Sequence, residues 1–116
     1  MKKGILQFLE GNRSINSFEI IDFRQFDTGF YLKLVVEFVN GTTLHAKEYF
    51  DVSERNYSFH WQDQKGNMLL RWDNAPHHPN LITFPHHKHK NTGVAPSHEI
   101  TLEEVIIFIE KEITKS

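Results

Sequence analysis

The stretch YSFHWQDQKGNMLLRWD, residues 57–73, decides the fold of this chain. On both sides of Lys65-Gly66, large apolar side chains alternate with polar ones, which is the pattern of two β-strands with one buried face. A two-residue turn at Lys65-Gly66 would make the stretch a β-hairpin. Its buried cross-strand pairs, of a kind that stabilises sheets, would be Phe59 with Trp72 and Trp61 with Leu70.

The same register places His60 opposite Arg71 on the other face of the hairpin. Trp61 is therefore expected in the core, whereas His60 is a candidate for a polar site beside Arg71. The second strand continues directly into Asp73 and a histidine-rich segment. One face of this hairpin is therefore predicted to pack in the core, and the other face is predicted to carry the candidate polar site.

Three further strands are predicted before this hairpin, and the third follows the loop that ends the second. Residues 18–26 are rich in Ile and Phe, and the turn sequence Asp27-Thr28-Gly29 follows them. Residues 30–39 alternate apolar and polar side chains and lead into Asn40-Gly41, which is a strong hairpin signal.

A three-residue loop, Asn40-Gly41-Thr42, keeps the apolar side chains of this earlier hairpin on one face. A two-residue loop would turn the second strand over, because a slip of one residue exchanges the two faces. The predicted cross-strand pairs are Phe38 with Leu44, Val36 with Ala46, and Glu37 with His45.

The C-terminal region predicts a helix. Residues 101–104, TLEE, form a capping box, and Ile100 and Val105 can close a hydrophobic staple around it. Apolar residues then recur at i, i+3, i+4 and i+7, which indicates a helix over residues 102–115.

Weaker signals complete the fold. Apolar residues at helical spacing predict a short helix over residues 4–10, which Gly11 can end. Residues 81–84 are apolar enough for a short strand that ends at Pro85. The sequence therefore predicts an α+β fold: an antiparallel meander of about five strands, a short N-terminal helix, and a C-terminal helix packed on one face.

Composition places the chain among soluble globular proteins, with 39% hydrophobic and 24% charged residues in 116. That length suits one domain, residues 1–116, with a single core. The absence of Cys excludes disulfides and thiolate metal sites and favours a reducing compartment. The apolar run near the N-terminus is interrupted by Gln7 and Glu10, and no stretch approaches a membrane span. We expect a cytoplasmic protein with no membrane association.

The net charge and its distribution along the chain indicate which kind of ligand the protein binds. The net charge of −2 argues against a strongly basic coat for nucleic acid. Residues 85–90 nevertheless hold three His and two Lys without an acid, whereas residues 99–112 hold five Glu and one Lys. A local basic patch of this kind favours one anionic ligand over a long duplex.

Residues 71–90, RWDNAPHHPNLITFPHHKHK, combine five of the eight histidines with three of the four prolines. Buried segments are apolar and periodic, and ordinary loops favour Gly, Ser, Asn and Asp, so this composition indicates a polar site. If the segment is extended, His87 and His89 point to one side. A solvated basic loop is the simpler explanation, but five histidines within residues 77–89 favour a function.

Two chemistries fit these residues. In the favoured one, histidines act as general acid and base on a phosphodiester without a metal ion, because imidazole titrates near neutral pH. Cationic side chains would then stabilise the negative charge of the phosphate. The predicted catalytic residues are His77, His78, His87 and His89, and the predicted substrate-binding residues are Arg71, Lys88, His60, Asp73 and Asn74.

The alternative is a site for a divalent metal such as zinc, because imidazole and carboxylate suit such ions. Its ligands would be His77, His78, His87, His89 and Asp73. The spacing matches no standard zinc motif, and Lys88 and Lys90 would repel a cation, so the metal-free chemistry is preferred. Asp73-Asn74 also has two interpretations, since it can cap a turn or orient a histidine.

The second half of the chain resembles the TumE-type toxin family of small prokaryotic proteins. The resemblance covers residues 57–109, with YSFHWQDQKGNMLLRWDNAPHHPNLITFPHHKH followed by SHEITLEEVIIFIE. The first half adds only compatible strands. The matching polar and proline positions are His60, Arg71, Asp73, Asn74, Pro76, His77, His78, Pro85, His86, His87 and His89.

This resemblance implies the toxin of a toxin–antitoxin pair, with a cognate antitoxin as partner, and it brings no settled mechanism. Together with the histidine-rich segment, it leads to the hypothesis of a ribonuclease toxin that cleaves RNA without a metal ion. The alternative is a non-catalytic module that binds a metal or an anion. The antitoxin could bind the Glu-rich C-terminal helix or the edge of the strand at residues 18–26, and homo-oligomers are also conceivable.

Overall fold

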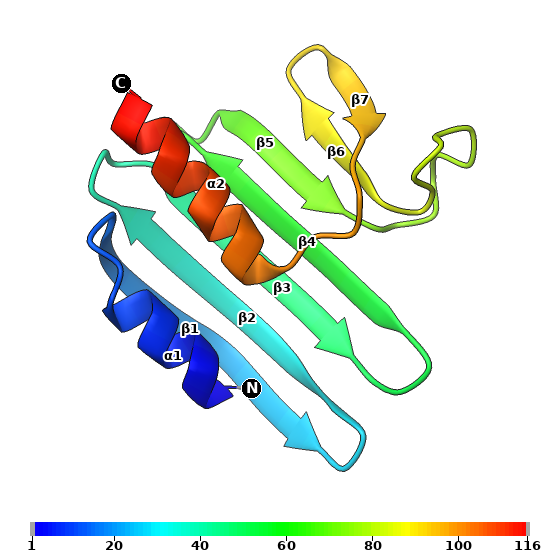
Figure 1. Cartoon of the computed structure of the whole chain (residues 1–116), viewed down its shortest axis with the longest axis horizontal. Coiled ribbons are helices and arrows are strands. Elements are labelled where there is room, and N and C mark those ends of the chain that lie inside the picture. Colours follow the sequence, from blue (N-terminus) through cyan, green and yellow to red (C-terminus); the bar gives the residue numbers. More distant parts are fainter. Residues whose placement is uncertain (1, 116) are drawn as a thin grey trace.

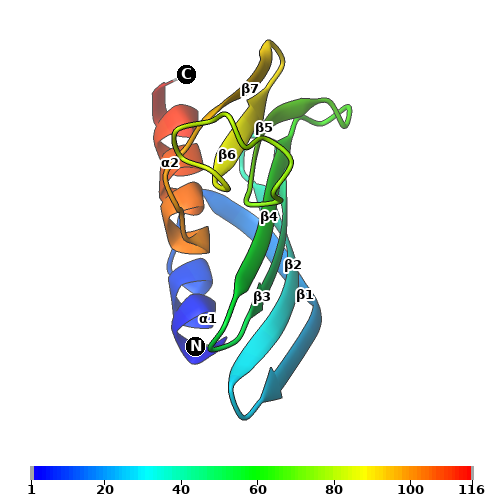
Figure 2. The ribbon, with the colours of Figure 1, turned by 90° about the vertical axis from the view of Figure 1, so that its right-hand side faces the viewer.

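A computed structural model describes residues 2–115 of the chain. Within them, one antiparallel sheet has its strands in chain order, and both helices lie on the same face (Figure 1, Figure 2). The elements are α1 (Lys2–Glu10), β1 (Ile15–Phe26), β2 (Gly29–Phe38), β3 (Thr43–Phe50), β4 (Arg55–Gln62), β5 (Met68–Asp73), β6 (His87–Lys90), β7 (Gly93–Pro96) and α2 (Leu102–Lys115). The predicted α+β class and meander are confirmed, whereas the strand count of about five is wrong, because the described chain has seven strands.

The two strands that the sequence did not predict are β6, at the C-terminal end of the histidine-rich segment, and β7, which follows it. β6 and β7 are short and lack the apolar alternation that identifies longer strands in a sequence. The strand predicted at residues 81–84 is wrong, because successive turns occupy this region. Phe84 N–H donates to the Leu81 carbonyl at 3.0 Å, and the Phe84–Pro85 peptide bond is cis.

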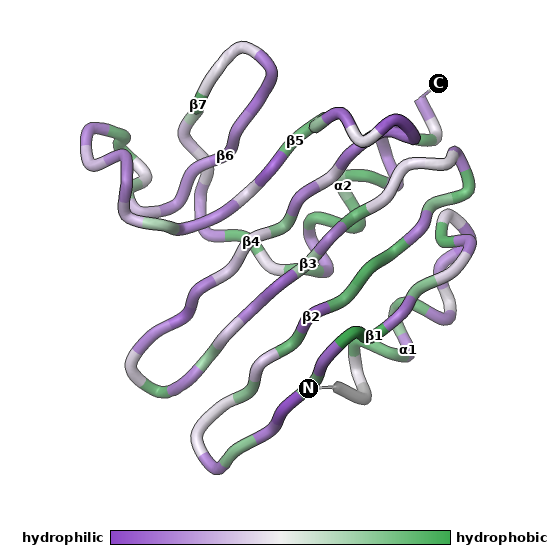
Figure 3. The backbone as a smooth tube through the Cα atoms, turned by 180° about the vertical axis from the view of Figure 1, so that it is seen from behind, coloured by the Kyte–Doolittle hydropathy of each residue, from purple (hydrophilic) through white to green (hydrophobic). Residues whose placement is uncertain are grey.

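The core lies between the sheet and the helices. Trp72 of β5 meets Phe108 of α2 edge-on, with ring centroids 5.5 Å apart. The buried residues of α2 are Leu102, Val105, Ile106 and Ile109. We call the side of the sheet that carries Trp72 the covered face. The other side, seen in Figure 3, is the open face.

The predicted pairing of β4 with β5 is confirmed: Phe59 lies opposite Trp72, Trp61 opposite Leu70, and His60 opposite Arg71. The turn, however, is longer than predicted. Asp63 and Asn67 close it with a backbone hydrogen bond of 2.9 Å, which leaves three loop residues that end in Gly66 at φ +87°. A register shift next to Trp61 leaves Leu69 as an extra residue in β5. Such a β-bulge restores the register that a two-residue turn would have given.

The predicted register of β2 with β3 is wrong by two residues. Val36 lies opposite Leu44, and Glu37 lies opposite Thr43 rather than His45. The loop has three residues, as predicted, but begins one position earlier, because Phe38 N–H donates to the Thr42 carbonyl. Gly41 ends the loop at φ +87°, as in a type I turn followed by a left-handed residue. A shift of two residues keeps the same face, so the apolar side chains remain in the core.

Both predicted helices are confirmed. α2 spans Leu102–Lys115, and its capping box forms: Glu104 N–H donates to Thr101 Oγ1 at 3.1 Å, and Thr101 N–H donates to Glu104 Oε1 at 2.9 Å. In the part of the chain that the structure describes, neither helix has the length and hydrophobicity needed to cross a membrane.

Candidate active site on the open face

Strands β5 and β6 carry most of the candidate site. Asp73 pairs with His87, and Arg71 pairs with His89. Side chains alternate along a strand, and Trp72 between Arg71 and Asp73 points into the core. Arg71, Asp73 and the two histidines therefore share the open face. The segment with His87 and His89 is extended, which was the condition for both rings to point to one side, because both residues lie in β6.

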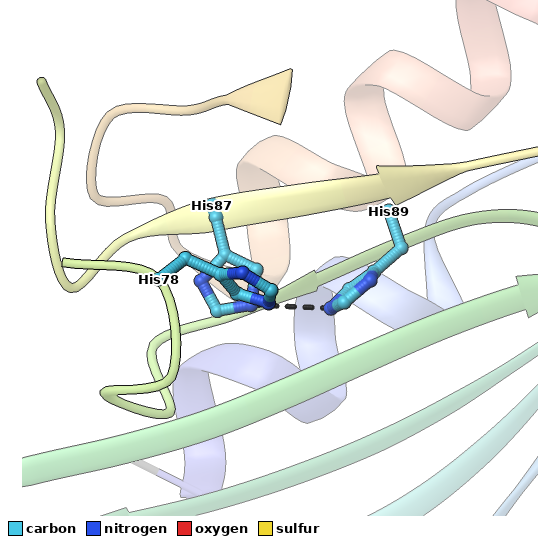
Figure 4. Close-up of side chains that lie close together, drawn as sticks. All are labelled: His78, His87 and His89. Atoms are coloured by element: carbon cyan, nitrogen blue, oxygen red, sulfur yellow. Dashed lines mark hydrogen bonds between the residues drawn. The ribbon is translucent and has the colours of Figure 1, made fainter. Parts of the chain in front are cut away.

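His78 joins this group from the loop between β5 and β6. The three histidines each offer a ring nitrogen, and these three atoms all lie within 4.8 Å of one another. Figure 4 shows His87 and His89 projecting from the same side of β6 toward the ring of His78. We call His78, His87 and His89 the histidine cluster.

Asp73 is the buried anion of the site. Its Oδ1 lies 2.8 Å from His87 Nε2 and accepts the Ala75 N–H at 3.1 Å. Its Oδ2 lies 3.3 Å from His89 Nε2 and 3.3 Å from Arg71 Nε. Both functions that the sequence left open for Asp73 are therefore present, since it caps the turn after β5 and also contacts two histidines.

Hydrogen bonding fixes the ring of His87. Its Nδ1 lies 2.9 Å from the carbonyl oxygen of Pro85, which can only accept, so Nδ1 carries the proton. In the neutral ring, Nε2 then carries a lone pair directed at Asp73 Oδ1 and at His89 Nε2, which is 3.1 Å away. A carboxylate oxygen also carries only lone pairs. The contact between His87 Nε2 and Asp73 Oδ1 therefore needs a proton or a cation between the two atoms, whereas an Nε2–H on His89 can serve the contact between the rings.

Burial affects two further histidines. Desolvation lowers the pKa of His89, and the charges of His87, Arg71 and His78 lower it further, while the carboxylate of Asp73 acts in the opposite direction. Desolvation also lowers the pKa of His60, aided by Arg71 and His45. Both shifts favour the neutral imidazole.

The cluster opens into a pocket of about 800 Å³ on the open face. The pocket also contains Arg71, Lys47 and Tyr57, and Asp73 is the one carboxylate among its lining residues in the described chain. A neighbouring hollow of about 350 Å³ is lined by cationic and histidine side chains without an acid; these are Lys33, His45, Lys47, His60 and Arg71.

Other predicted site residues lie outside the cluster. Lys88 pairs with Trp72 and so points to the covered face, away from the histidines. His77 is exposed at the edge of the pocket. Asn74 donates to the Arg55 carbonyl at 2.6 Å and accepts the Tyr57 N–H at 2.9 Å, so its amide completes the backbone bonding of β4.

Sequence reasoning missed several residues of the pocket. The hydroxyl of Tyr57 lies 2.8 Å from Nδ1 of His86, which ties the loop before β6 to β4. Tyr31 and Tyr49 also line the pocket from the open face of β2 and β3. The alternation around Tyr31 and Tyr49 could have placed them opposite the core face, but nothing local indicates that they approach the histidines.

Fold and site define a small α+β protein with a histidine-lined, largely cationic pocket on the open face of its sheet. A family model described as toxin TumE matches residues 5–113, so the chain belongs to the TumE toxin family. The match extends the resemblance seen in residues 57–109 to nearly the whole chain. Neither the curated proteins nor the solved structures include a significant match to it. Membership suggests the toxin of a toxin–antitoxin system, and hence an antitoxin as partner.

Proposed function

We propose that this toxin acts by cleaving RNA at the histidine cluster. The observation that carries the proposal is the charge of the pocket. Arg71 and Lys47 line it together with the cluster, and Asp73, the one carboxylate among the described lining residues, is already engaged by histidines. An anionic group that enters the pocket therefore meets cations and imidazole rings.

Arg71 is suited to hold the reacting phosphate. Its side chain is 42% exposed, and within residues 2–115 Asp73 alone bonds its guanidinium, through Nε. The two terminal nitrogens remain available to the pocket. Arginine can grip two phosphate oxygens at once, which fixes the orientation of the phosphodiester as well as its charge.

The open face offers a path for the rest of the strand. Lys33, His45 and Lys47 are exposed on β2 and β3, next to Arg71. Tyr31 and Tyr49 lie half-buried beside them and present rings to the pocket. Cationic grooves with aromatic rings are typical of proteins that bind single-stranded RNA, because the cations track phosphates and the rings stack on bases.

The chemistry we propose is cleavage of a phosphodiester in RNA that depends on the histidine cluster. The metal-free hypothesis from the sequence needs two histidines free to exchange protons with the substrate. In the structure, His87 directs both ring nitrogens at protein groups, namely Pro85 and Asp73. His87 is therefore better placed to hold a metal ion than to exchange protons with the substrate.

The test is a cleavage assay with purified protein and a labelled single-stranded RNA. His89→Ala should slow cleavage by at least about 10²-fold, the lower end of what a general acid or base contributes. His98→Ala, which removes an exposed histidine outside the pocket, is the matched control. If folded His89→Ala and His78→Ala proteins remain toxic in cells and cleave at the wild-type rate, the cluster is not the reacting centre. The non-catalytic binding module then becomes the better hypothesis.

A further inference from the structure

We infer that the histidine cluster is a binding site for one divalent transition-metal ion of the zinc type. The three ring nitrogens of His78, His87 and His89 would be its ligands, and Asp73 would either complete the coordination or neutralise the ion. Three imidazoles with a carboxylate form a donor set suited to zinc and similar ions. This inference concerns the centre of the proposed nuclease, but it does not require RNA to be the substrate.

Distances within the cluster support a shared ion. His87 Nε2 and His89 Nε2 are 3.1 Å apart, and the three ligand atoms lie within 4.8 Å of one another. Two nitrogens on one tetrahedral zinc are about 3.4 Å apart, given Zn–N distances of about 2.0–2.1 Å. The pair on β6 is thus nearly in place, and the half-buried His78 ring has to approach by up to about 1.4 Å, the difference between 4.8 Å and about 3.4 Å.

His87 has the outer partner expected of a metal ligand. Its Nδ1–H donates to the Pro85 carbonyl, which directs the Nε2 lone pair toward the centre of the cluster. Histidines that bind metals commonly donate their other ring N–H to a carbonyl or carboxylate, because this fixes the tautomer and the ring orientation. His87 is also almost fully buried, at 2% exposure, so its orientation is tightly constrained.

A divalent ion fits the point at which these groups converge. The Nε2 atoms of His87 and His89 and the two oxygens of Asp73 converge, and each of these four atoms lies within 3.3 Å of at least one of the others. Protons on the two rings would serve these contacts one pair of atoms at a time. An ion between them can contact the nitrogens and an oxygen together.

The structure also weakens the main objection from the sequence. Lys88 and Lys90 were expected to repel a cation from His87 and His89, and the structure removes the first of these two lysines from the site. In β6, Lys88 points to the covered face beside Trp72, while both histidines point to the open face. Lys47 and Lys90 still line the pocket, and Arg71 is next to the cluster, where Asp73 Oδ2 lies 3.3 Å from its Nε.

Zinc titration of chelator-treated protein, followed by calorimetry without RNA, tests the inference. The wild-type chain should bind one Zn²⁺, and Co²⁺ in its place should give the visible absorption of a tetrahedral site. His78→Ala or His89→Ala should weaken Zn²⁺ binding by more than about 100-fold, beyond the 10–100-fold typical of outer partners. His98→Ala, which alters an exposed histidine outside the pocket, should bind like the wild type.

Each outcome decides the matter. The inference is overturned if the wild type binds no Zn²⁺, or if His98→Ala weakens binding as much as His89→Ala does. The test uses variants of His78 and His89 because both residues are only half-buried, whereas His87→Ala is informative only if the protein still folds. Circular dichroism checks the folding of each variant. The zinc titration contains no RNA, so its result is independent of the cleavage assay. If the protein cleaves RNA but binds no zinc, only this inference is overturned. If it binds zinc but does not cleave RNA, only the proposed function is overturned.

Discussion

The Nε2 atom of His87 lies 2.8 Å from Oδ1 of Asp73, and the two side chains are only 2% and 8% exposed. A buried carboxylate is costly unless charge and hydrogen bonds compensate it. Asp73 has both, because it also contacts His89 and Arg71 and accepts the Ala75 N–H. The negative charge of this carboxylate is therefore central to the site.

Asp73→Asn keeps the size of the side chain and removes that charge. We expect RNA cleavage and zinc affinity to fall by about 10–100-fold, as when a group that orients a metal ligand is changed. Cleavage rates and zinc titrations of the folded variant measure the effect. Asp27→Asn, in the exposed turn between β1 and β2, is the matched control. A variant at Asp73 that performs like this control would remove Asp73 from the mechanism.

Trp72→Ala tests the core beneath the site. Trp72 lies opposite Phe59 and packs against the edge of Phe108, with 3% of its surface exposed. Truncation of a buried Trp costs about 3–5 kcal/mol, because contacts are lost and a cavity remains. Urea denaturation should show this loss in the free energy of unfolding. A loss below about 0.5 kcal/mol, within the range of surface substitutions, would contradict the buried position of Trp72.

The register around Trp72 was predictable because large apolar residues on both strands must share one face. The loop length was not, since nothing in QDQKGN distinguishes a two-residue turn from a three-residue turn compensated by a bulge at Leu69. In the earlier hairpin, the two registers differ by two residues and bury the same side chains. Alternation alone cannot separate them.

The site residues, too, could be placed from the sequence only in part. The spacing of His87 and His89 placed both rings on one side of a strand, because the period of two is a property of the backbone. The choice between His77 and His78 depends on the turns of the 74–86 loop, which no periodicity describes. Lys88 was assigned to the phosphate by its position in the chain, although the same alternation places it on the other face.

Asp51 should control the acid stability of the β3–β4 connection. The hydroxyl of Tyr49 and the N–H groups of Ser53 and Glu54 donate to its carboxylate. These bonds, with Tyr49 the largest cause, lower the pKa of Asp51 to about 2 from 3.8. The folded state therefore binds the proton less readily than the unfolded state, so the contribution is present above pH 3.8 and is lost as the pH falls toward 2.

Asp51→Asn isolates this effect. Other carboxylates titrate in the same range, so the informative quantity is the difference in unfolding free energy between wild type and variant. That difference should be constant above about pH 5 and should shrink between about pH 4 and pH 2. Chemical denaturation across this range measures it. A difference that does not change with pH would contradict the assigned contacts of Asp51.

Arg71→Lys keeps the positive charge of the pocket and removes the planar group. If Arg71 holds two phosphate oxygens, cleavage should fall by at least about 10-fold, because a lysine cannot make the paired contact. Lys65→Arg, in the exposed turn after β4, is a control for a charge-conserving change. Comparison of kcat and KM locates the loss. An unchanged KM and kcat would show that Arg71 provides charge alone.

The last prediction concerns the antitoxin that membership in a toxin family suggests. β1 is an edge strand, and edge strands present unpaired backbone groups to which another chain can add a strand. Ile21, at the register shift in β1, is 46% exposed and would offer the partner an apolar contact. The competing surface is α2, where Ile107 is 39% exposed among glutamates.

Co-purification from the intact operon distinguishes the two surfaces. We expect a stable complex that Ile21→Asp weakens, because a charge on β1 must then be buried against the partner. Val52→Asp, which alters a side chain 82% exposed between β3 and β4, should leave the complex intact. Loss of the complex in Ile107→Asp but not in Ile21→Asp would move the antitoxin to α2. Recovery of this chain alone from the operon would argue against either surface, because a neutralising partner has to remain bound while the toxin is held inactive.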